Sequence, residues 1–347
     1  MLRFLLIMYF ANSSYADSGA NISLDLQSEI ILLFQNTDGG WPKNIKWDQF
    51  KTIKEASDNL KDLKAKSTID NSATYTEIRL LNKAYHKTKN STYRDAALRG
   101  LKFILREQRT SGGWRGADVD AITFNDNAMI GVMRLLTEVV QSKSEFSYIE
   151  ETTRIKCQQA LDKALKVVLD CQIVVNGKKT AWCQQHHHIS LKPIKARTYE
   201  LPSISGVESV EIIRYLMGIE EPSNEIIESI EGAILWFRQS AINDLRIEKF
   251  AIKPEQYNNK IINHDIRTVT DNNAKPIWAR FYDINTNRPF FCNRDGIKVY
   301  TLHEVKLERR TGYSWYSYSP EKLLNKDYPK WKKKLKSGIK NTNAKIN

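Results

Sequence analysis

Two short stretches combine carboxylate and amide side chains in a way that could bind a cation: STIDNSAT at 67–74 and ITFNDNAM at 122–129. Each places an aspartate, Asp70 or Asp126, beside an asparagine at the expected start of a helix. Such oxygen ligands suit a hard cation such as calcium, and because the sequence has no EF-hand loop, any site must be assembled across the fold. Helix capping is the alternative interpretation, since aspartate and asparagine are both good N-cap residues.

A third stretch, KARTYELPS at 195–203, brings two cations close to aromatic and acidic side chains. Lys195 and Arg197 lie two residues apart, and Tyr199 and Glu200 follow directly. Cations among aromatic and apolar neighbours are expected to meet an anion rather than to lie on a freely solvated face.

Further arginines gather later in the chain, with Arg280 in WARFYD and Arg294 in NRDG. Guanidinium groups match the geometry of carboxylates with two parallel hydrogen bonds, so clustered loop arginines suit a polyanionic ligand. Internal pairing is the alternative, with Asp283 near Arg280 and Asp295 next to Arg294. Three more arginines lie nearby: Arg288, Arg309 and Arg310.

Other catalytic devices are missing from the sequence, which contains no GxSxG elbow, no HExxH and no glycine-rich phosphate loop. A glycosidase would need two carboxylates facing across a cleft, and Asp70, Asp126 and Glu200 could supply such a pair. The HHH triplet at 186–188 could bind a metal, although an exposed loop triplet is more often incidental. The four cysteines form no CxxC pair, which argues against a zinc cluster.

An internal repeat indicates how the chain positions these residues. QNTDGGW at 35–41 recurs as QRTSGGW at 108–114 and, more loosely, as QIVVNGKKTAW at 172–182. An apolar stretch precedes each copy, and helices are expected at 71–86, 126–140 and 207–218. Repeated helical pairs can curl into a closed toroid with its loops collected at one end. A plain helical bundle with chance GGW turns is the alternative.

The two ends of the chain differ from its body. Residues 1–16 combine one cation, a short apolar run and a small-residue end, which predicts a cleaved secretory signal peptide. The segment 322–347 carries nine lysines against one acid and accounts for much of the net charge of +13. It could bind nucleic acid or an anionic surface, but we expect a solvated tail. A secreted protein seldom meets nucleic acid, and no later stretch is apolar enough to cross a membrane.

Eight motifs, taken in order, resemble the family 10 polysaccharide lyases, which are pectate lyases. They are GGWPKN (39–44), TIDNSAT (68–74), ITFNDNAM (122–129), TAWCQQH (180–186), KARTYELPSISGVES (195–209), ARFYDINTNRP (279–289), NRDG (293–296) and RRTGYSWY (309–316). The resemblance covers residues 17–316. One departure is the short loop GGWRGADVDAITF, where Arg115 stands at a position usually held by proline, and the substrate groove is expected to be more open there.

The resemblance implies a mainly α fold, an (α/α)3 toroid with an irregular, loop-rich second lobe. It implies a secreted enzyme that cleaves polygalacturonate by calcium-dependent β-elimination. By motif, Asp70 and Asp126 are expected to hold Ca2+ and the substrate carboxylate, and Arg197 is expected to be the catalytic base. Substrate binding is expected of Asn71, Lys195, Arg280 and Arg294.

The domain organisation then follows from these expectations. A catalytic domain should span 17–321, with the toroid reaching to about 243 and the loop-rich lobe covering 244–321, followed by the lysine-rich tail. We expect a monomer that binds polygalacturonate, without a nucleic-acid or membrane partner. A hydrolase on the same toroid and a non-catalytic uronan-binding protein are the rival functions.

An arginine base requires a lowered pKa, because the ordinary value for this side chain is about 12.5 or higher. Burial and the neighbouring cations, Lys195 and bound calcium, are expected to lower the pKa of Arg197. An alkaline optimum would follow.

Overall fold

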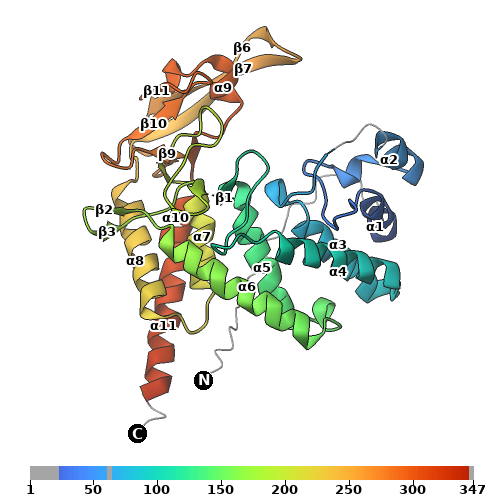
Figure 1. Cartoon of the computed structure of the whole chain (residues 1–347). Coiled ribbons are helices and arrows are strands. Elements are labelled where there is room, and N and C mark those ends of the chain that lie inside the picture. Colours follow the sequence, from blue (N-terminus) through green and yellow to red (C-terminus); the bar gives the residue numbers. More distant parts are fainter. Residues whose placement is uncertain (1–22, 61–64, 344–347) are drawn as a thin grey trace. The chain divides into compact units, whose positions relative to one another are not determined.

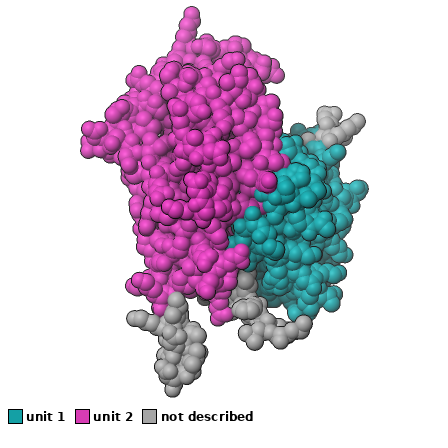
Figure 2. All heavy atoms as spheres, turned by 60° about the vertical axis from the view of Figure 1, so that its left-hand side comes forward, with its two compact units in different colours: residues 1–170, 187–191 teal, residues 171–186, 192–347 magenta. Residues whose placement is uncertain are grey.

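The computed structural model describes residues 23–60 and 65–343 of the chain (Figure 1). The predicted signal peptide, 1–16, lies outside these residues. The chain divides into two compact units, which Figure 2 colours teal and magenta. Unit 1 contains residues up to 170 together with 187–191, and unit 2 contains 171–186 and 192 onwards. The domain boundaries expected from the sequence stay a prediction.

Unit 1 is built from helices that pack in pairs, α3 with α4 and α5 with α6. Its helices are α1 (Leu24–Leu33), α2 (Ile53–Leu60), α3 (Tyr75–Thr88), α4 (Ser91–Arg106), α5 (Ala128–Val140) and α6 (Glu151–Asp170). Its short elements are η1 (Trp47–Gln49), η2 (Asp70–Ser72), β1 (Ala121–Thr123), η3 (Asn125–Asn127) and η4 (Ser144–Phe146). The mainly helical fold and the helices expected at 71–86 and 126–140 are confirmed.

Helix α5 lies in the interior of unit 1 because its sequence, AMIGVMRLLTEVV, is apolar on nearly every side. Gly131 allows α3 to come close: a Cβ at this position would lie 2.1 Å from Cζ of Tyr75. The helix that begins just after the second acidic stretch is therefore held on all sides by close packing.

Unit 2 combines helices with short antiparallel sheets. Its helices are α7 (Glu208–Met217), α8 (Asn224–Gln239), α9 (Leu307–Thr311), α10 (Ser319–Lys322) and α11 (Tyr328–Asn343), with the turns η5 (Leu302–Glu304) and η6 (Leu323–Asp327). One four-stranded sheet has the order β11 (Lys298–Val299), β10 (Pro289–Cys292), β9 (Phe281–Tyr282) and β5 (Ile204–Ser205). The remaining short strands are β2 (Val174–Val175), β3 (Lys178–Lys179), β4 (Gln185–His187), β8 (Trp278–Ala279) and β12 (Tyr316–Ser317).

The segment after residue 243 differs from the expected irregular loops. It begins with a long antiparallel hairpin, β6 (Leu245–Tyr257) and β7 (Lys260–Thr270), whose register shifts between Ala251 and Glu255. The β-branched residues of KIINHDIRTVT favour a strand, and Asn258 with φ 48° suits a tight hairpin turn. The expectation of irregular loops was wrong here because these strand-favouring residues lie among polar residues, and such a composition is typical of loops.

Hydrogen bonds show that the three copies of the sequence repeat adopt one structure. The opening glutamine of each copy, Gln35, Gln108 or Gln172, donates two side-chain hydrogen bonds to backbone carbonyls. One acceptor is in its own loop and the other is on a helix of the same unit, α4, α6 or α8. The acceptors on these helices are Ala96, Ala160 and Ser229.

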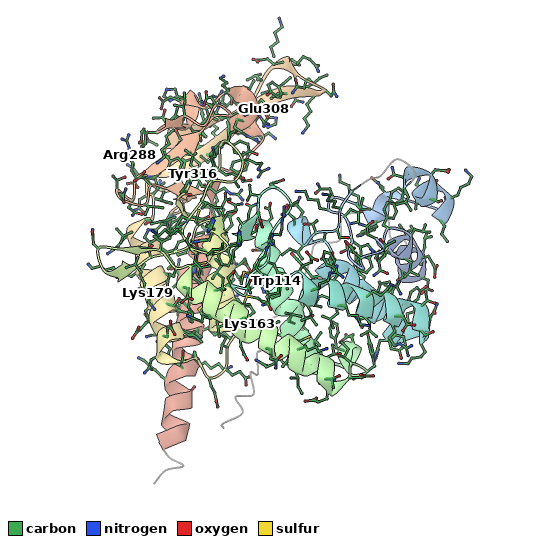
Figure 3. All side chains as sticks on the ribbon, viewed as in Figure 1. Trp114, Lys163, Lys179, Arg288, Glu308 and Tyr316 are labelled. Carbon is green, nitrogen blue, oxygen red and sulfur yellow. The ribbon has the colours of Figure 1, made fainter. Side chains whose placement is uncertain are left out.

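The tryptophan that closes each copy is fully buried and ties the loop to the start of a helix. The carbonyls of Trp41, Trp114 and Trp182 each accept a hydrogen bond from a backbone N–H shortly before α3, α5 or α7; Figure 3 labels Trp114. The donors are Thr68 (3.0 Å), Thr123 (3.0 Å) and Ser205 (2.7 Å). The GGW motifs are therefore structural anchors, whereas closure into a toroid stays a prediction.

The last segment is more ordered than the expected solvated tail. Residues 319–343 form the consecutive helical elements α10, η6 and α11, and Tyr328 and Trp331 are buried. No helix of the described residues is long and apolar enough to cross a membrane. All four cysteines are buried free thiols.

Candidate functional site

The two acidic stretches of unit 1 form turns with the same unusual backbone. Asn71 in η2 has φ 49° and ψ 41°, and Asp126 in η3 has φ 49° and ψ 31°. Left-handed backbone is uncommon outside glycine, but asparagine and aspartate tolerate it. The two turns pack against each other within unit 1, so the structure brings Asp70 and Asp126 into neighbouring turns.

The carboxylate of Asp70 is buried and held by several donors. Its Oδ2 accepts hydrogen bonds from Nζ of Lys43 (2.7 Å) and from the backbone of Ala117 (3.3 Å). Its Oδ1 accepts from the backbone N–H of Asn71 (3.1 Å). Lys43 also reaches Asp118 at 3.4 Å. Lys43 lies in GGWPKN, but sequence analysis assigned it no role.

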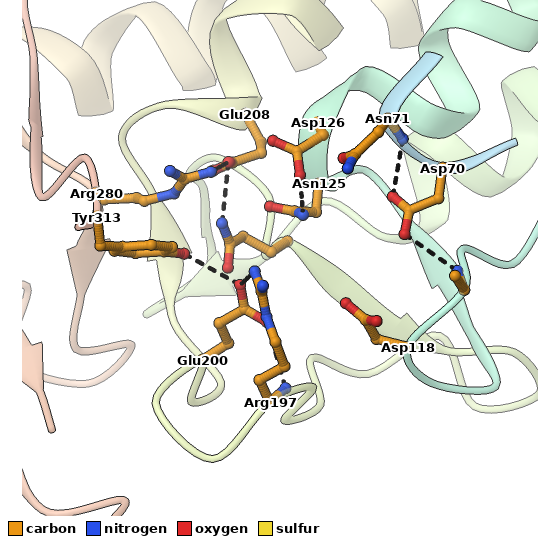
Figure 4. Close-up of polar contacts among 12 residues, drawn as sticks. Asp70, Asn71, Asp118, Asn125, Asp126, Arg197, Glu200, Glu208, Arg280 and Tyr313 are labelled. Atoms are coloured by element: carbon orange, nitrogen blue, oxygen red, sulfur yellow. Dashed lines mark hydrogen bonds and ion pairs between the residues drawn. The ribbon is translucent and has the colours of Figure 1, made fainter. Parts of the chain in front are cut away.

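The amide groups beside these acids are also fixed. Nδ2 of Asn71 donates to Oδ1 of Asn44 (2.7 Å), and Nδ2 of Asn125 donates to the Asp126 carboxylate (2.7 Å; Figure 4). The N-cap residues of α3 and α5 are Thr74 and Asn127, and neither makes a side-chain capping hydrogen bond. Cation binding by Asp70 and Asp126, and the alternative that they cap helices, both stay predictions.

These turns offer only oxygen ligands, carboxylate and amide, which is the chemistry that Ca2+ takes. Among the described residues, however, no three His, Cys, Asp or Glu side chains group closely enough to hold a metal. Ca2+ requires about six to eight oxygen ligands. The donor set therefore fits a calcium ion whose remaining ligands come from water or from a bound carboxylate.

In unit 2, Arg197 pairs with Glu200 through both arms of its guanidinium group (Figure 4). Nε of Arg197 donates to Oε2 of Glu200 at 2.9 Å, and Nη2 donates to Oε1. Glu200 is 1% exposed and also accepts a hydrogen bond from the hydroxyl of Tyr313 at 3.1 Å. The Arg197 side chain remains 41% exposed, so solvent reaches part of it.

Two tyrosine rings organise the arginines around this pair. Tyr199 and Tyr313 meet edge to face, with centroids 5.4 Å apart. Arg197 and Arg294 lie over the Tyr199 ring at 5.1 and 5.7 Å, and Arg280 lies over the Tyr313 ring at 4.7 Å. Arg309 contacts both rings, at 4.6 and 5.0 Å. The structure thus brings Arg197, Arg280 and Arg294 together, joined by stacking that desolvated aromatic faces favour.

Arg280 is anchored by a buried carboxylate. Its Nη2 donates to Oε1 of Glu208, which also accepts from Nε2 of Gln184 at 2.9 Å. The other oxygen of Glu208 accepts from the hydroxyl of Ser205. Arg280 and Glu208 are both buried, so this arginine is a fixed donor rather than a mobile surface cation.

Sequence reasoning missed Glu208, although the repeat contains the signal. The hydrogen bonds to the three tryptophan carbonyls align Thr68, Thr123 and Ser205. Three residues further along each copy stand Asn71, Asp126 and Glu208. Glu208 is thus the counterpart, in the third copy, of residues predicted to bind cation and substrate.

Arg294 pairs with Glu308 at 3.0 Å (Nε to Oε2) and 2.6 Å (Nη2 to Oε1), and its side chain is 52% exposed. The expected internal partners were wrong for both loop arginines. Asp283 pairs with Lys298 at 2.7 Å, and Asp295 accepts the backbone N–H of Ile297. Lys195 is exposed at the start of the same loop as Arg197.

The electrostatics of Arg197 differ from the expectation. The hydrogen bonds to Glu200 raise the pKa of Arg197 above its ordinary value, and they outweigh the lowering effect of burial. Glu308 raises the pKa of Arg294 in the same way. The expected lowering of the Arg197 pKa was wrong because sequence reasoning counted the cation at 195 but not the partnership with the carboxylate three residues ahead.

A model of the pectic acid lyase family matches residues 35–324. The chain belongs to the pectic acid lyase family. It is a polysaccharide lyase, and the resemblance stated from the motifs is confirmed. No curated protein matches it.

Two solved structures of a family 10 polysaccharide lyase from Cellvibrio cellulosa are similar to this pectic acid lyase family member. One, a point mutant in complex with trigalacturonic acid, has a TM-score of 0.73 and 30% sequence identity, covering 88% of this chain and 92% of its own. The other has a TM-score of 0.71 at 30% identity, covering 88% and 91%. The roles of individual site residues stay predictions.

Proposed function

We propose that this lyase is a secreted, monomeric, calcium-dependent pectate lyase (EC 4.2.2.2) that cleaves polygalacturonate by β-elimination. The observation that carries the proposal is the group of arginines stacked on Tyr199 and Tyr313, which suits a ligand with a carboxylate on every sugar. The trigalacturonic acid bound to the related lyase is a ligand of that chemistry.

In this proposal Asp70 and Asp126 would hold the calcium ion, and the substrate carboxylate would be a further ligand. Bound calcium would draw negative charge from that carboxylate and so increase the acidity of the C5 proton beside it. Asn71 contacts the substrate from the same turn as Asp70. Its left-handed backbone and its hydrogen bond to Asn44 keep the side chain in place.

Arg280 and Arg294 bind the carboxylates of the substrate in different ways. Arg280, fixed by Glu208, acts as a preorganised donor that needs no reorientation during the reaction. Arg294 is more exposed than Arg280 and binds a uronate carboxylate of the incoming substrate, together with the exposed Lys195. Stacking on the tyrosine rings holds the planes of Arg280 and Arg294 and so limits the rotamers lost on binding.

Arg197 acts as the base. A guanidine nitrogen takes the C5 proton, the C4–C5 double bond forms, the C4–O4 bond breaks, and the departing O4 is protonated by water. Glu200 positions Arg197 but also stabilises its charged form. The neutral base therefore becomes populated only when this partnership loosens or the pH rises, which predicts an alkaline optimum.

Hydrolysis has less support from these contacts. Glu200 is engaged by Arg197 and Tyr313, and Asp70 by Lys43, so neither is placed as an independent acid or base.

The mass of the products tests the proposed reaction. β-Elimination divides an oligogalacturonate into two fragments whose masses add up to that of the substrate, whereas hydrolysis adds one water. We expect fragments without added water, each new non-reducing end carrying an unsaturated sugar. Fragments that all contain the added water would overturn the proposal in favour of a hydrolase.

A further inference from the structure

The C-terminal helical segment carries a line of lysines that the proposed reaction does not use. Residues 319–343 run through α10, η6 and α11, beside α8 (Figure 1). Six of its lysine side chains are exposed: Lys322, Lys326, Lys330, Lys333, Lys334 and Lys336. In the part of the chain that the structure describes, none of these six forms an ion pair.

Three acids on or near this segment form ion pairs with cations other than these six lysines. Glu321 pairs with Lys275 at 3.3 Å, and Asp327 pairs with Arg214 at 2.8 Å. Glu231 on α8 takes Lys332 at 2.6 Å and also accepts the hydroxyl hydrogen of Tyr328 at 2.6 Å. The segment therefore keeps its carboxylates turned toward the protein and leaves a surface of one sign.

Four of the lysines lie along one side of the segment at four-residue intervals: Lys322, Lys326, Lys330 and Lys334. We call these four the lysine stripe. At a helical rise of about 1.5 Å per residue, the stripe is about 18 Å long. The π turn η6, in which Tyr328 donates to the Leu323 carbonyl, brings Tyr328 under Leu323 and so keeps the buried side aligned across the junction.

The buried side of the segment is already used. Leu323 is fully buried, Tyr328 and Trp331 are 8% and 7% exposed, and Arg238 of α8 covers the Tyr328 ring at 5.4 Å. A helix that binds a bilayer needs a free apolar face beside its basic one. Up to residue 337, the last whose side chain is described, the segment has no such face, so its charge favours a soluble polyanion over a membrane.

We propose that the lysine stripe is a second, non-catalytic binding surface for polygalacturonate. The identity of the polyanion rests on the proposed function. A flexible chain with one carboxylate per sugar can meet several lysines of the stripe at once, following the turn of about 40° between lysines four residues apart on an α-helix. Each exposed pair is weak and screened by salt, but contacts within one chain reinforce one another. The stripe would hold the polymer near the enzyme and leave short oligomers unaffected.

The test compares two variants of the full-length protein that lose the same charge. One is K322Q/K326Q/K330Q/K334Q, which removes the stripe. The control, K83Q/K102Q/K156Q/K163Q, changes four exposed lysines on α3, α4 and α6 of unit 1; Figure 3 labels Lys163. Affinity electrophoresis in gels containing polygalacturonate measures binding at low and high salt, and cleavage of trigalacturonate measures the reaction.

We expect the stripe variant to bind polygalacturonate about tenfold more weakly at low salt, and the control to stay within about twofold of the wild type. The difference should shrink at high salt, and both variants should cleave trigalacturonate at the wild-type rate. Wild-type affinity in the stripe variant, or an equal loss in the control, would overturn the proposal.

Two further outcomes separate this proposal from others. If double-stranded DNA or vesicles of anionic lipid bind the stripe more tightly than polygalacturonate does, the assigned partner is wrong. If the wild type binds polygalacturonate through the stripe but produces no unsaturated ends, the proposed lyase reaction fails while the binding surface stands.

Discussion

The two units hold their buried glutamates in different ways. In unit 2, Glu200 and Glu208 each face an arginine, so charge is balanced where it is buried. In unit 1, Glu77 accepts a hydrogen bond from the indole N–H of Trp47 at 3.0 Å, and the groups that act on its pKa include backbone N–H donors but no cation. Burial accordingly raises the pKa of Glu77 to about 7.

This difference shows what each unit is prepared to bind. The glutamates of unit 2 fix arginines whose remaining faces can receive carboxylates. Unit 1 instead presents Asp70 and Asp126 in neighbouring turns, with Lys43 as the cation that contacts Asp70. The arginines of unit 2 thus suit an anionic ligand, and the carboxylates in the turns of unit 1 suit a cation. The predictions below test this contrast.

The largest effect is expected at Arg197. Arg197→Ala removes the proposed base and should lower kcat by about 10³-fold. Arg267→Ala serves as the control, because this arginine pairs with Glu248 on the β6–β7 hairpin. Rates of β-elimination on trigalacturonate measure both variants. A kcat near that of the wild type for Arg197→Ala would remove Arg197 from the mechanism.

Glu77→Gln should stabilise the protein at alkaline pH. Because the pKa of Glu77 is raised on folding, the wild type loses stability as the pH rises from about 4.5 through about 7, and the loss is complete above that range. Glutamine keeps an acceptor for Trp47 and removes the charge, so the gain at pH ~9 should be about 3 kcal/mol.

Urea unfolding across this pH range measures the difference, with Glu228→Gln, an exposed glutamate on α8, as the control. A gain of equal size at acidic pH would show that packing, rather than ionisation, is the cause.

Asp126→Asn tests the cation side of the contrast. Asparagine tolerates the left-handed backbone of this position, so the turn should persist while one carboxylate is lost. We expect the calcium concentration for half-maximal activity to rise on the order of 10- to 100-fold, with the melting temperature unchanged. A variant with a clearly lowered melting temperature and an unaltered calcium response would favour a structural role for Asp126.

Glu200→Gln should give the smallest change in rate but the most informative pH profile. Removing the carboxylate lowers the pKa of Arg197, because Glu200 is the main reason that it is raised. The rise of kcat with pH, which follows deprotonation of Arg197, should therefore occur at lower pH than in the wild type. A variant with reduced kcat and an unmoved profile would limit Glu200 to positioning.

The helices that the repeat marks could be predicted from the sequence, whereas the carboxylate partners of the arginines could not. The repeat located α3, α5 and α7, and the Asp and Asn residues of the two acidic stretches do lie in neighbouring turns. The glutamate that anchors Arg280 lies 72 residues away in sequence. Nearby acids such as Asp295 seemed natural partners, but its side chain caps its own turn.

The third copy of the repeat shows a second reason why parts of the site could not be predicted from the sequence. Glu208 occupies the place of Asn71 and Asp126, but its loop, QIVVNGKKTAW, has lost the GGW pattern. The hydrogen bonds of Gln172, and that from the Ser205 N–H to the Trp182 carbonyl, restore the alignment. Similarly, the β6–β7 hairpin is stabilised by pairing between strands, and polar residues in both strands hide that pairing from a composition-based reading.

One measurement tests the central claim most directly: ultraviolet absorbance while the purified protein acts on polygalacturonate at alkaline pH, first with calcium and then with a chelator. The account predicts a steady rise from the conjugated C4–C5 double bond, which stops on chelation and resumes when calcium is restored. Growth of reducing ends without any rise in absorbance would contradict it, because the glycosidic bond would then be broken by water.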